Sequence, residues 1–405
     1  MLICNAIICD SNTQYTADVR IENGVIAEIG NNLTDDEAVD ATGCYVLPGL
    51  VDTNVRLKDL QLSGKNLETL SREALEGGVS TVVLSGEMIG RVDNEITLEF
   101  VQKHQLHDGG AKIECAISAL SEEGNLTNIA LLLKKGGKAL YTKTIGDYNL
   151  IMRMAQYLKM SNKPLFYFAC DKSLSDSGVM SDGAIATSLG LPGIPAICEV
   201  VHIAAMIEIA REYGITIVFK SVTEPRSVEL IAQARREGVK AECEVALHHL
   251  LHSDESCRGF DTDAKINPPL VNESKRQKLI SALQQGNINA LSALHQPNSD
   301  VYKDITFNDA SYGTTSIGEY LPLCYTHLVK SGLIDMPTLV RLTSQTPAQQ
   351  AGLDIGKIGV GEKANLILFN PNDSLKVSHH HSLYKNETLS GRVAMAIQGD
   401  EITRF

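Results

Sequence analysis

Residues 50–55 read LVDTNV, a short apolar run that predicts a buried strand, and a longer amphipathic stretch follows it. The same alternation recurs along the chain. Seven further strand candidates are STVVLS (80–85), KIECAI (112–117), KALY (138–141), PLFYF (164–168), ITIVFK (215–220), VKAEC (239–243) and INALSAL (288–294). Eight strand-and-helix units over about 300 residues favour a closed parallel (β/α)8 barrel, the TIM barrel, over a doubly wound open sheet.

The two ends of the chain have a different pattern of apolar and polar residues from its middle. Short runs of alternating apolar and polar residues fill about the first and the last fifty positions, and Asn23-Gly24 between two such runs is a strong hairpin-turn signal. We therefore expect one small β-sandwich domain assembled from residues 1–49 and 353–405. The barrel then comprises residues 50–352.

Composition excludes several classes of protein. Hydrophobic residues make up 43% of the chain and charged residues 21%, as in soluble globular proteins. The net charge of −13 argues against nucleic-acid binding, which needs a basic surface. No run of eighteen apolar residues predicts a membrane span, and the N-terminal stretch lacks the features of a signal peptide. Nine scattered cysteines without a CxxC pair indicate free thiols, which we interpret as a cytoplasmic location.

Four longer motifs give a closer assignment. They are PGLVDTNVRLK (48–58), GVMSDGAIATSLGLPGIPAICE (178–199), ECEVALHHLLHSDE (242–255) with FDTDAKINPPL (260–270), and TPAQQAGLDIGKIGVGEKANLILFNP (346–371). Together they resemble the type I dihydroorotases, cyclic amidohydrolases of the amidohydrolase superfamily, along nearly the whole chain. The resemblance implies an amidohydrolase-type barrel and a place in de novo pyrimidine biosynthesis. It also implies zinc as the cofactor of the active relatives.

The first metal-binding positions implied by the resemblance hold other residues in this chain. The His-x-His pair after the first strand is replaced by Asn54 and Arg56, and a guanidinium has no lone pair to give to a metal. The aspartate expected after the fourth strand falls in a segment that holds Lys143. Some relatives use a carbamylated lysine there, but Lys143 lacks the neighbouring histidine pair.

The later positions of the implied site are changed as well. Phe168 stands for the histidine after the fifth strand, and Ser221, or Lys220 under a shift of one residue, stands for the histidine after the sixth. Leu294 replaces the aspartate after the eighth strand, which is the general base in active relatives. Since metal lowers the pKa of bound water from 15.7 to about 7, loss of the ligands and of the base together predicts loss of hydrolysis.

Three positions are candidates for substrate contact by the same resemblance. Lys58 stands for an arginine after the first strand, Asn267 belongs to the proline loop, and His295 follows the eighth strand. We expect cationic side chains such as Arg56 and Lys58, paired with acids such as Asp171, to fill the mouth of the barrel.

Other groups that could carry chemistry are weaker candidates. His248 and His249 match histidine-bearing scaffold of the family, and we interpret them as packing or loop residues. The run His379–His381 could bind metal adventitiously, without a catalytic role. Cys170 occupies the place of a glutamate and lacks an evident base, so a nucleophilic thiol is disfavoured.

Two functions follow from these observations. The favoured one is a dihydroorotase homologue without metal or cofactor, which forms a homo-oligomer and acts as a structural or regulatory partner of aspartate carbamoyltransferase. The resemblance implies this role because metal-free dihydroorotase-like chains act so in some bacteria. The alternative is an active dihydroorotase, or another cyclic-amide hydrolase, with an unusual site.

Overall fold

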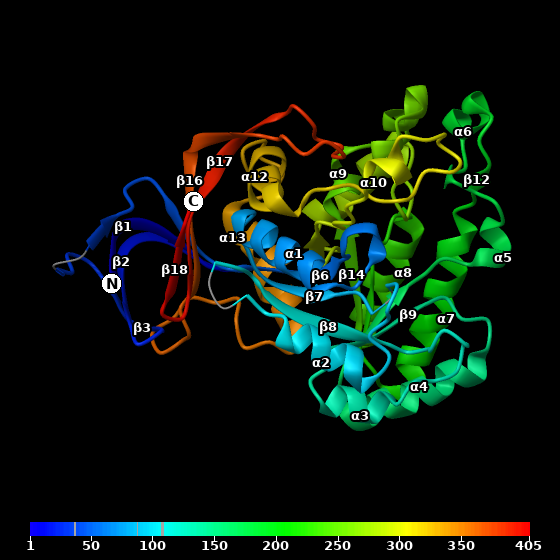
Figure 1. The fold of residues 1–405 in the computed structure, drawn as a ribbon, viewed down its shortest axis with the longest axis horizontal. Helices are drawn as coiled ribbons and strands as arrows, with labels where there is room; N and C mark the ends of the chain where they lie inside the picture. Colours follow the sequence, from blue (N-terminus) through cyan, green and yellow to red (C-terminus); the bar gives the residue numbers. More distant parts are fainter. Residues whose placement is uncertain (36–37, 87, 107–108) are drawn as a thin grey trace.

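The computed structural model describes residues 1–35, 38–86, 88–106 and 109–405. It contains two eight-stranded sheets, one surrounded by helices and one at the end of the molecule where both termini lie (Figure 1). Among the helices of these residues, none combines the length and the apolar character needed to cross a membrane.

The sheet surrounded by helices is a parallel barrel. Its strands are β6 (Leu50–Val55), β7 (Val79–Leu84), β8 (Lys112–Ser118), β9 (Ala139–Lys143), β10 (Leu165–Phe168), β13 (Ile217–Phe219), β14 (Ala241–Ala246) and β15 (Ala290–Ser292). They pair in chain order from β6 to β15, each parallel to the next. All eight strand candidates of the sequence contribute, and the predicted (β/α)8 fold class is confirmed.

Helices cover the outside of the barrel. After the first seven strands come α1 (Gly64–Glu76), α2 (Glu95–Lys103), α3 (Ile129–Lys134), α4 (Tyr148–Ser161), α7 (Ile197–Tyr213), α8 (Pro225–Arg236) and α10 (Glu273–Gln284). After β15 come α12 (Tyr320–Cys324), α13 (Met336–Val340) and α14 (Thr346–Gln350). Local sequence fixes where they start: the Ser63 side chain caps α1 by accepting from Asn66 N at 3.2 Å, and Asp147 caps α4.

A buried carboxylate closes the barrel between its first and last strands. Asp52 on β6 accepts a hydrogen bond from Ala293 N, just beyond β15, at 2.6 Å, and another from Asn54 N at 2.8 Å. Arg56 N also donates to His295 O at 2.9 Å. Burial raises the pKa of Asp52 to about 6, a cost that the two backbone donors partly offset.

The second sheet is mostly antiparallel and is built from both termini. Its strands are β1 (Leu2–Cys9), β2 (Gln14–Glu22), β3 (Val25–Gly30), β4 (Ala38–Asp40), β5 (Tyr45–Pro48), β16 (Asn365–Lys376), β17 (Thr388–Gln398) and β18 (Glu401–Arg404). The β2–β3 turn has positive φ at Asn23 (51°) and Gly24 (71°), as the sequence predicted. The domain boundaries at residues 49/50 and 352/353 stay predictions.

Short elements in the connecting segments complete the fold. They are α5 (Lys172–Ser175), β11 (Met180–Ser181), α6 (Ala184–Leu189), β12 (Gly193–Ile194), α9 (Leu247–Leu251) and α11 (Asp300–Lys303), with single 3-10 turns at Lys58–Leu60, Asp254–Phe260, Thr262–Ala264 and Ile317–Glu319 and π-helical turns at Tyr325–Val329 and Arg341–Gln345. All nine cysteines lie in the described ranges, and each is a free thiol.

Candidate functional site

The predicted site residues gather at one end of the barrel. Asn54 lies on β6, Lys143 ends β9, and Phe168 ends β10. Ser221 and Leu294 lie just beyond β13 and β15. These are the carboxyl ends of parallel strands, the face at which TIM barrels carry their functional groups.

The side chains that replace the His-x-His pair are bonded to each other. Asn54 Nδ2 donates to Ser221 Oγ at 2.7 Å, which links two of the changed positions directly. Arg56 is buried, and its Nη1 donates to Asn54 Oδ1 at 3.3 Å. Asn54 therefore uses its amide oxygen as well as its amide nitrogen inside the protein.

An ion pair occupies the interior beside them. The Lys220 ammonium contacts the Glu244 carboxylate, and the two side chains are 1% and 0% exposed. Lys220 Nζ also donates to Thr53 Oγ1 at 2.7 Å and lies 4.5 Å from the centre of the Phe166 ring. Burial lowers the pKa of Lys220, and the charge of Glu244 opposes that shift.

Glu244 is the centre of this network. Its Oε1 accepts from Asn54 Nδ2 at 2.7 Å and from Ser292 Oγ at 3.1 Å, and its Oε2 accepts from Thr53 Oγ1 at 3.1 Å. The carboxylate on β14 thus joins β6, β15 and the residue after β13 through hydrogen bonds. A buried charge is tolerated only when it is paired and hydrogen-bonded in this way.

The backbone is left-handed at two of the changed positions. Ser221 has φ of 52° and Leu294 has φ of 46°, a conformation that residues other than glycine rarely adopt. The Leu294 side chain is buried in an apolar cluster with Met180, Leu270 and Phe307. An apolar contact therefore stands where the resemblance places a proton acceptor.

A small cavity remains beside the network. It has a volume of about 30 Å³, and its lining includes Cys170, Glu199 and Asn267. Glu199 accepts from Thr223 N at 3.0 Å, and burial raises its pKa to about 7. Burial also raises the pKa of the Cys170 thiol, which disfavours the nucleophilic thiolate.

The other predicted contact residues lie outside this lining. Lys58 is exposed in a 3-10 turn that follows β6. His295 is buried, and its Nδ1 accepts from Ser316 N and Ile317 N at 3.2 Å each. Burial lowers the pKa of His295 to about 3, so the ring is neutral. Substrate contact by Lys58, Asn267 and His295 stays a prediction.

The remaining candidates make internal contacts. Asp171 accepts from Ser173 and pairs with His202 at 2.6 Å, and these bonds hold the pKa of its carboxyl well below the usual range. His248 contacts Tyr384 Oη at 2.8 Å, and His249 contacts Pro268 O at 3.0 Å. Each of these side chains is engaged in fixing a loop or a helix.

Sequence reasoning missed the partner of Lys220. Glu244 is one of two glutamates in the strand AECEVA, and by the alternation of a strand it shares a face with Glu242 and Ala246. A charged residue in the core requires a partner. That requirement could have paired Glu244 with the lysine that ends ITIVFK on the adjacent strand.

Comparisons with known proteins identify the family of the chain. The Dihydro-orotase-like family model matches residues 43–221. A dihydroorotase of Ruminiclostridium cellulolyticum is 33% identical over 403 residues, which cover 96% of this chain and 94% of that protein. The chain belongs to the dihydroorotase-like family.

Two further relatives extend the comparison. A dihydroorotase-like protein of Pseudomonas aeruginosa is 29% identical over 97% of this chain and 96% of its own length. The solved structure of an L-hydantoinase from Arthrobacter aurescens superposes with a TM-score of 0.89 over 100% of this chain and 95% of that one, at 19% identity. The second likeness supports the amidohydrolase fold.

The residues at the barrel mouth do not fit the zinc of the family. Zinc is bound by imidazole, thiolate or carboxylate donors. Asn54, Arg56, Phe168 and Leu294 offer an amide, a cation and two hydrocarbons instead, and Glu244, a carboxylate within reach, is neutralised by Lys220. A dication here would meet two fixed positive charges, on Arg56 and Lys220. The positive charge in this site is therefore carried by the side chains of Arg56 and Lys220.

The buried pair predicts a strong thermodynamic coupling. Lys220→Met leaves Glu244 buried without its cation, and Glu244→Gln leaves the ammonium without its anion, so each should lower the free energy of unfolding by about 3–5 kcal/mol. The double variant should lose less than the sum, because neither charge remains. Urea unfolding of the four proteins measures the coupling.

The exposed pair of Lys103 and Glu99, at 2.7 Å, supplies the control. Lys103→Met should change stability little, since solvent screens that pair. Strictly additive losses at Lys220 and Glu244 would contradict the network described above.

The neutral His295 predicts a dependence of stability on pH. In the unfolded chain a histidine titrates near 6.5, whereas His295 in the fold titrates at about 3. The contribution of the neutral His295 ring to the free energy of unfolding is therefore fully present above pH 6.5 and is lost as the pH falls. Between pH 7 and pH 5 the loss is about 2 kcal/mol.

His295→Asn should remove this part of the pH dependence, because the amide oxygen can accept the same backbone bonds without taking up a proton. Unfolding free energies at pH 7 and pH 5 test it. His104→Asn changes an exposed imidazole and should keep the wild-type dependence. An unchanged pH profile in His295→Asn would show that the buried ring is not responsible.

Proposed function

We propose that this chain is a dihydroorotase homologue of pyrimidine biosynthesis that neither binds the catalytic zinc nor hydrolyses dihydroorotate. In this proposal it acts as a structural or regulatory partner of aspartate carbamoyltransferase. The observation that carries the proposal is the buried ion pair of Lys220 and Glu244, tied to Asn54 and Thr53 in the centre of the barrel mouth.

The ion pair supports loss of hydrolysis for a chemical reason. Hydrolysis of a cyclic amide needs an activated water and a group that moves its proton. The ammonium of Lys220 is committed to Glu244 and Thr53, and the carboxylate of Glu244 is saturated by donors. Leu294, at the place of the general base, is a hydrocarbon. These groups are bonded to one another, so none of the three is available to take a proton from a substrate.

The size of the remaining cavity supports the same proposal. Sites for small organic ligands usually enclose about 300–1,000 Å³. The cavity beside Glu199 and Asn267 measures about 30 Å³, which is room for a water molecule. A six-membered ring with its carboxylate would require the proline loop or α7 to move away.

The partner, the oligomer and the location are proposed on family grounds. The family resemblance extends along nearly the whole chain, so it supports a role that depends on the fold and not on the barrel mouth alone. We therefore propose binding to aspartate carbamoyltransferase, self-association into a homo-oligomer and a cytoplasmic location.

A second candidate function is an active dihydroorotase or cyclic-amide hydrolase with an unusual site. The observation in its favour is the 33% identity over 96% of the chain to a protein named dihydroorotase. Glu199, with its pKa raised to about 7 beside the cavity, would be the acid–base group of such an enzyme.

Turnover distinguishes the two candidates. Tag-free protein, supplied with Zn²⁺, should hydrolyse dihydroorotate, and cyclise carbamoyl aspartate, no faster than a blank without protein. Glu199→Gln, purified in the same way, reveals contaminating host enzyme, because a contaminant is equally active in both preparations. Saturable turnover that scales with protein and disappears in Glu199→Gln would establish the second candidate instead.

Assembly tests the proposed partner. Co-expressed with aspartate carbamoyltransferase of the same organism, the chain should elute with it in size-exclusion chromatography. Omission of this chain should reduce carbamoyltransferase activity or its assembly. Separate elution, with carbamoyltransferase activity unaffected by omission, would exclude the role.

A further inference from the structure

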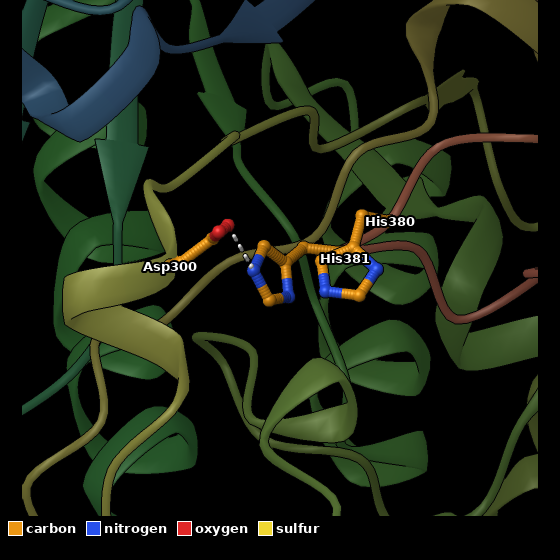
Figure 2. A group of neighbouring side chains, drawn as sticks. All are labelled: Asp300, His380 and His381. Atoms are coloured by element: carbon orange, nitrogen blue, oxygen red, sulfur yellow. Dashed lines mark hydrogen bonds and ion pairs between the residues drawn. The ribbon is translucent and has the colours of Figure 1, made fainter.

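A cluster of histidine and aspartate side chains lies apart from the barrel-mouth network. Asp300 on α11 and the consecutive residues His380 and His381, on the segment between β16 and β17, place one potential ligand atom each within 4.8 Å of the others (Figure 2). We propose that these three side chains bind a late first-row dication such as Zn²⁺. Asp263 orients His381 from behind.

His381 is built into the protein as a metal ligand would be. Its Nδ1 contacts Asp263 Oδ1 at 3.0 Å, and its Nε2 contacts Asp300 Oδ1 at 3.0 Å (Figure 2 shows the second contact). The His381 side chain is 9% exposed. A carboxylate on the far ring nitrogen fixes the tautomer and directs the near nitrogen at the metal, as in carboxylate–histidine–zinc arrangements.

The side chains must adjust to hold a metal, because their ligand atoms lie within 4.8 Å of one another. With bonds of about 2.0–2.1 Å, two ligands of a tetrahedral zinc lie about 3.4 Å apart. The 3.0 Å contact between His381 Nε2 and Asp300 Oδ1 would open by a few tenths of an ångström. Asp300 can supply that movement, because its side chain is 72% exposed. Two imidazoles and a carboxylate are the donors that zinc prefers.

The backbone around the cluster is held on both sides. Thr315 N donates to His381 O at 2.9 Å, and Leu383 N donates to Thr314 Oγ1 at 3.0 Å. On the opposite side, the buried Lys303 of α11 donates to Thr262 O at 2.6 Å, which ties the Asp300 helix to the turn that carries Asp263. A metal ion would therefore bind between two segments whose backbones are held in place, and would join the β16–β17 connection to the barrel loops.

His380 is the ligand that has a competitor. Lys385 Nζ contacts His380 Nδ1 at 3.0 Å, so the ammonium occupies the only acceptor nitrogen of the neutral ring and adds a positive charge near the site. Metal binding must displace that contact, whichever ring nitrogen it uses, because the other nitrogen carries the proton while Nδ1 accepts. Removal of the Lys385 charge should therefore favour the metal.

Titration of tag-free, full-length protein with ZnCl2, in competition with a chromophoric chelator, tests the site. We expect one zinc per chain and binding that is weaker by at least about tenfold in Asp300→Asn, His380→Ala and Asp263→Ala. Lys385→Ala should bind about two- to fivefold more tightly, the range of an exposed charge effect. Zinc should also raise the Tm of the wild type and not that of His380→Ala.

Matched variants separate this site from others. His104→Ala removes an exposed histidine elsewhere, and Asp304→Asn removes an exposed acid next to α11. Both should keep wild-type affinity. Binding that is lost in His380→Ala but kept in Asp300→Asn and Asp263→Ala would mean adventitious binding to a surface histidine, and would overturn the proposal. Wild-type affinity in all three, or no binding at all, would overturn it equally. None of these outcomes affects the turnover test of the proposed function.

Discussion

The buried ion pair of Lys220 and Glu244 is the constraint on which the barrel mouth depends. Both charges are removed from water, and each stabilises the other. Neutral side chains complete the network, since Thr53 Oγ1 accepts from Lys220 and Ser292 Oγ donates to Glu244. Because Thr53 and Ser292 come from the first and the last strand, the pair also contributes to the closure that Asp52 makes by hydrogen bonding to Ala293 N. The same hydrogen-bonded residues thus neutralise the buried charges and link the first strand of the barrel to the last.

The same pair bears on the proposed loss of metal binding. A metal site brings positive charge that inward-facing carboxylates neutralise. With histidines absent at Asn54 and Arg56, a carboxylate such as Glu244 would be left buried and unpaired, at a cost of several kcal/mol. Lys220 supplies the missing positive charge from the adjacent strand. The left-handed backbone at Ser221 and Leu294 shows that the chain is strained just beyond two of the barrel strands.

The sequence predicted the architecture because its signals are local and repeated. Eight apolar runs with intervening amphipathic stretches, and Asn23-Gly24 between alternating runs, each report on a few neighbouring residues. The site was predicted only as a set of replaced positions, Asn54 to Leu294. Its actual organisation depends on side chains that are 24 residues apart at Lys220 and Glu244 and 190 apart at Asn54 and Glu244. Charge pairing across strands depends on which residues are neighbours in three dimensions, and a single sequence does not show which residues those are.

The run His379–His381 also shows what a sequence alone does not predict about a site. In the sequence, His379–His381 is three adjacent histidines in a terminal segment, and adjacency alone suggests only adventitious metal binding. Folding separates their surroundings: His379 lies 3.4 Å from Glu319, His380 contacts Lys385, and His381 lies between Asp263 and Asp300. Only His381 has a carboxylate on each ring nitrogen. What distinguishes a built metal site from a basic surface run is therefore the second carboxylate behind the ring, because it fixes which nitrogen faces the ligand.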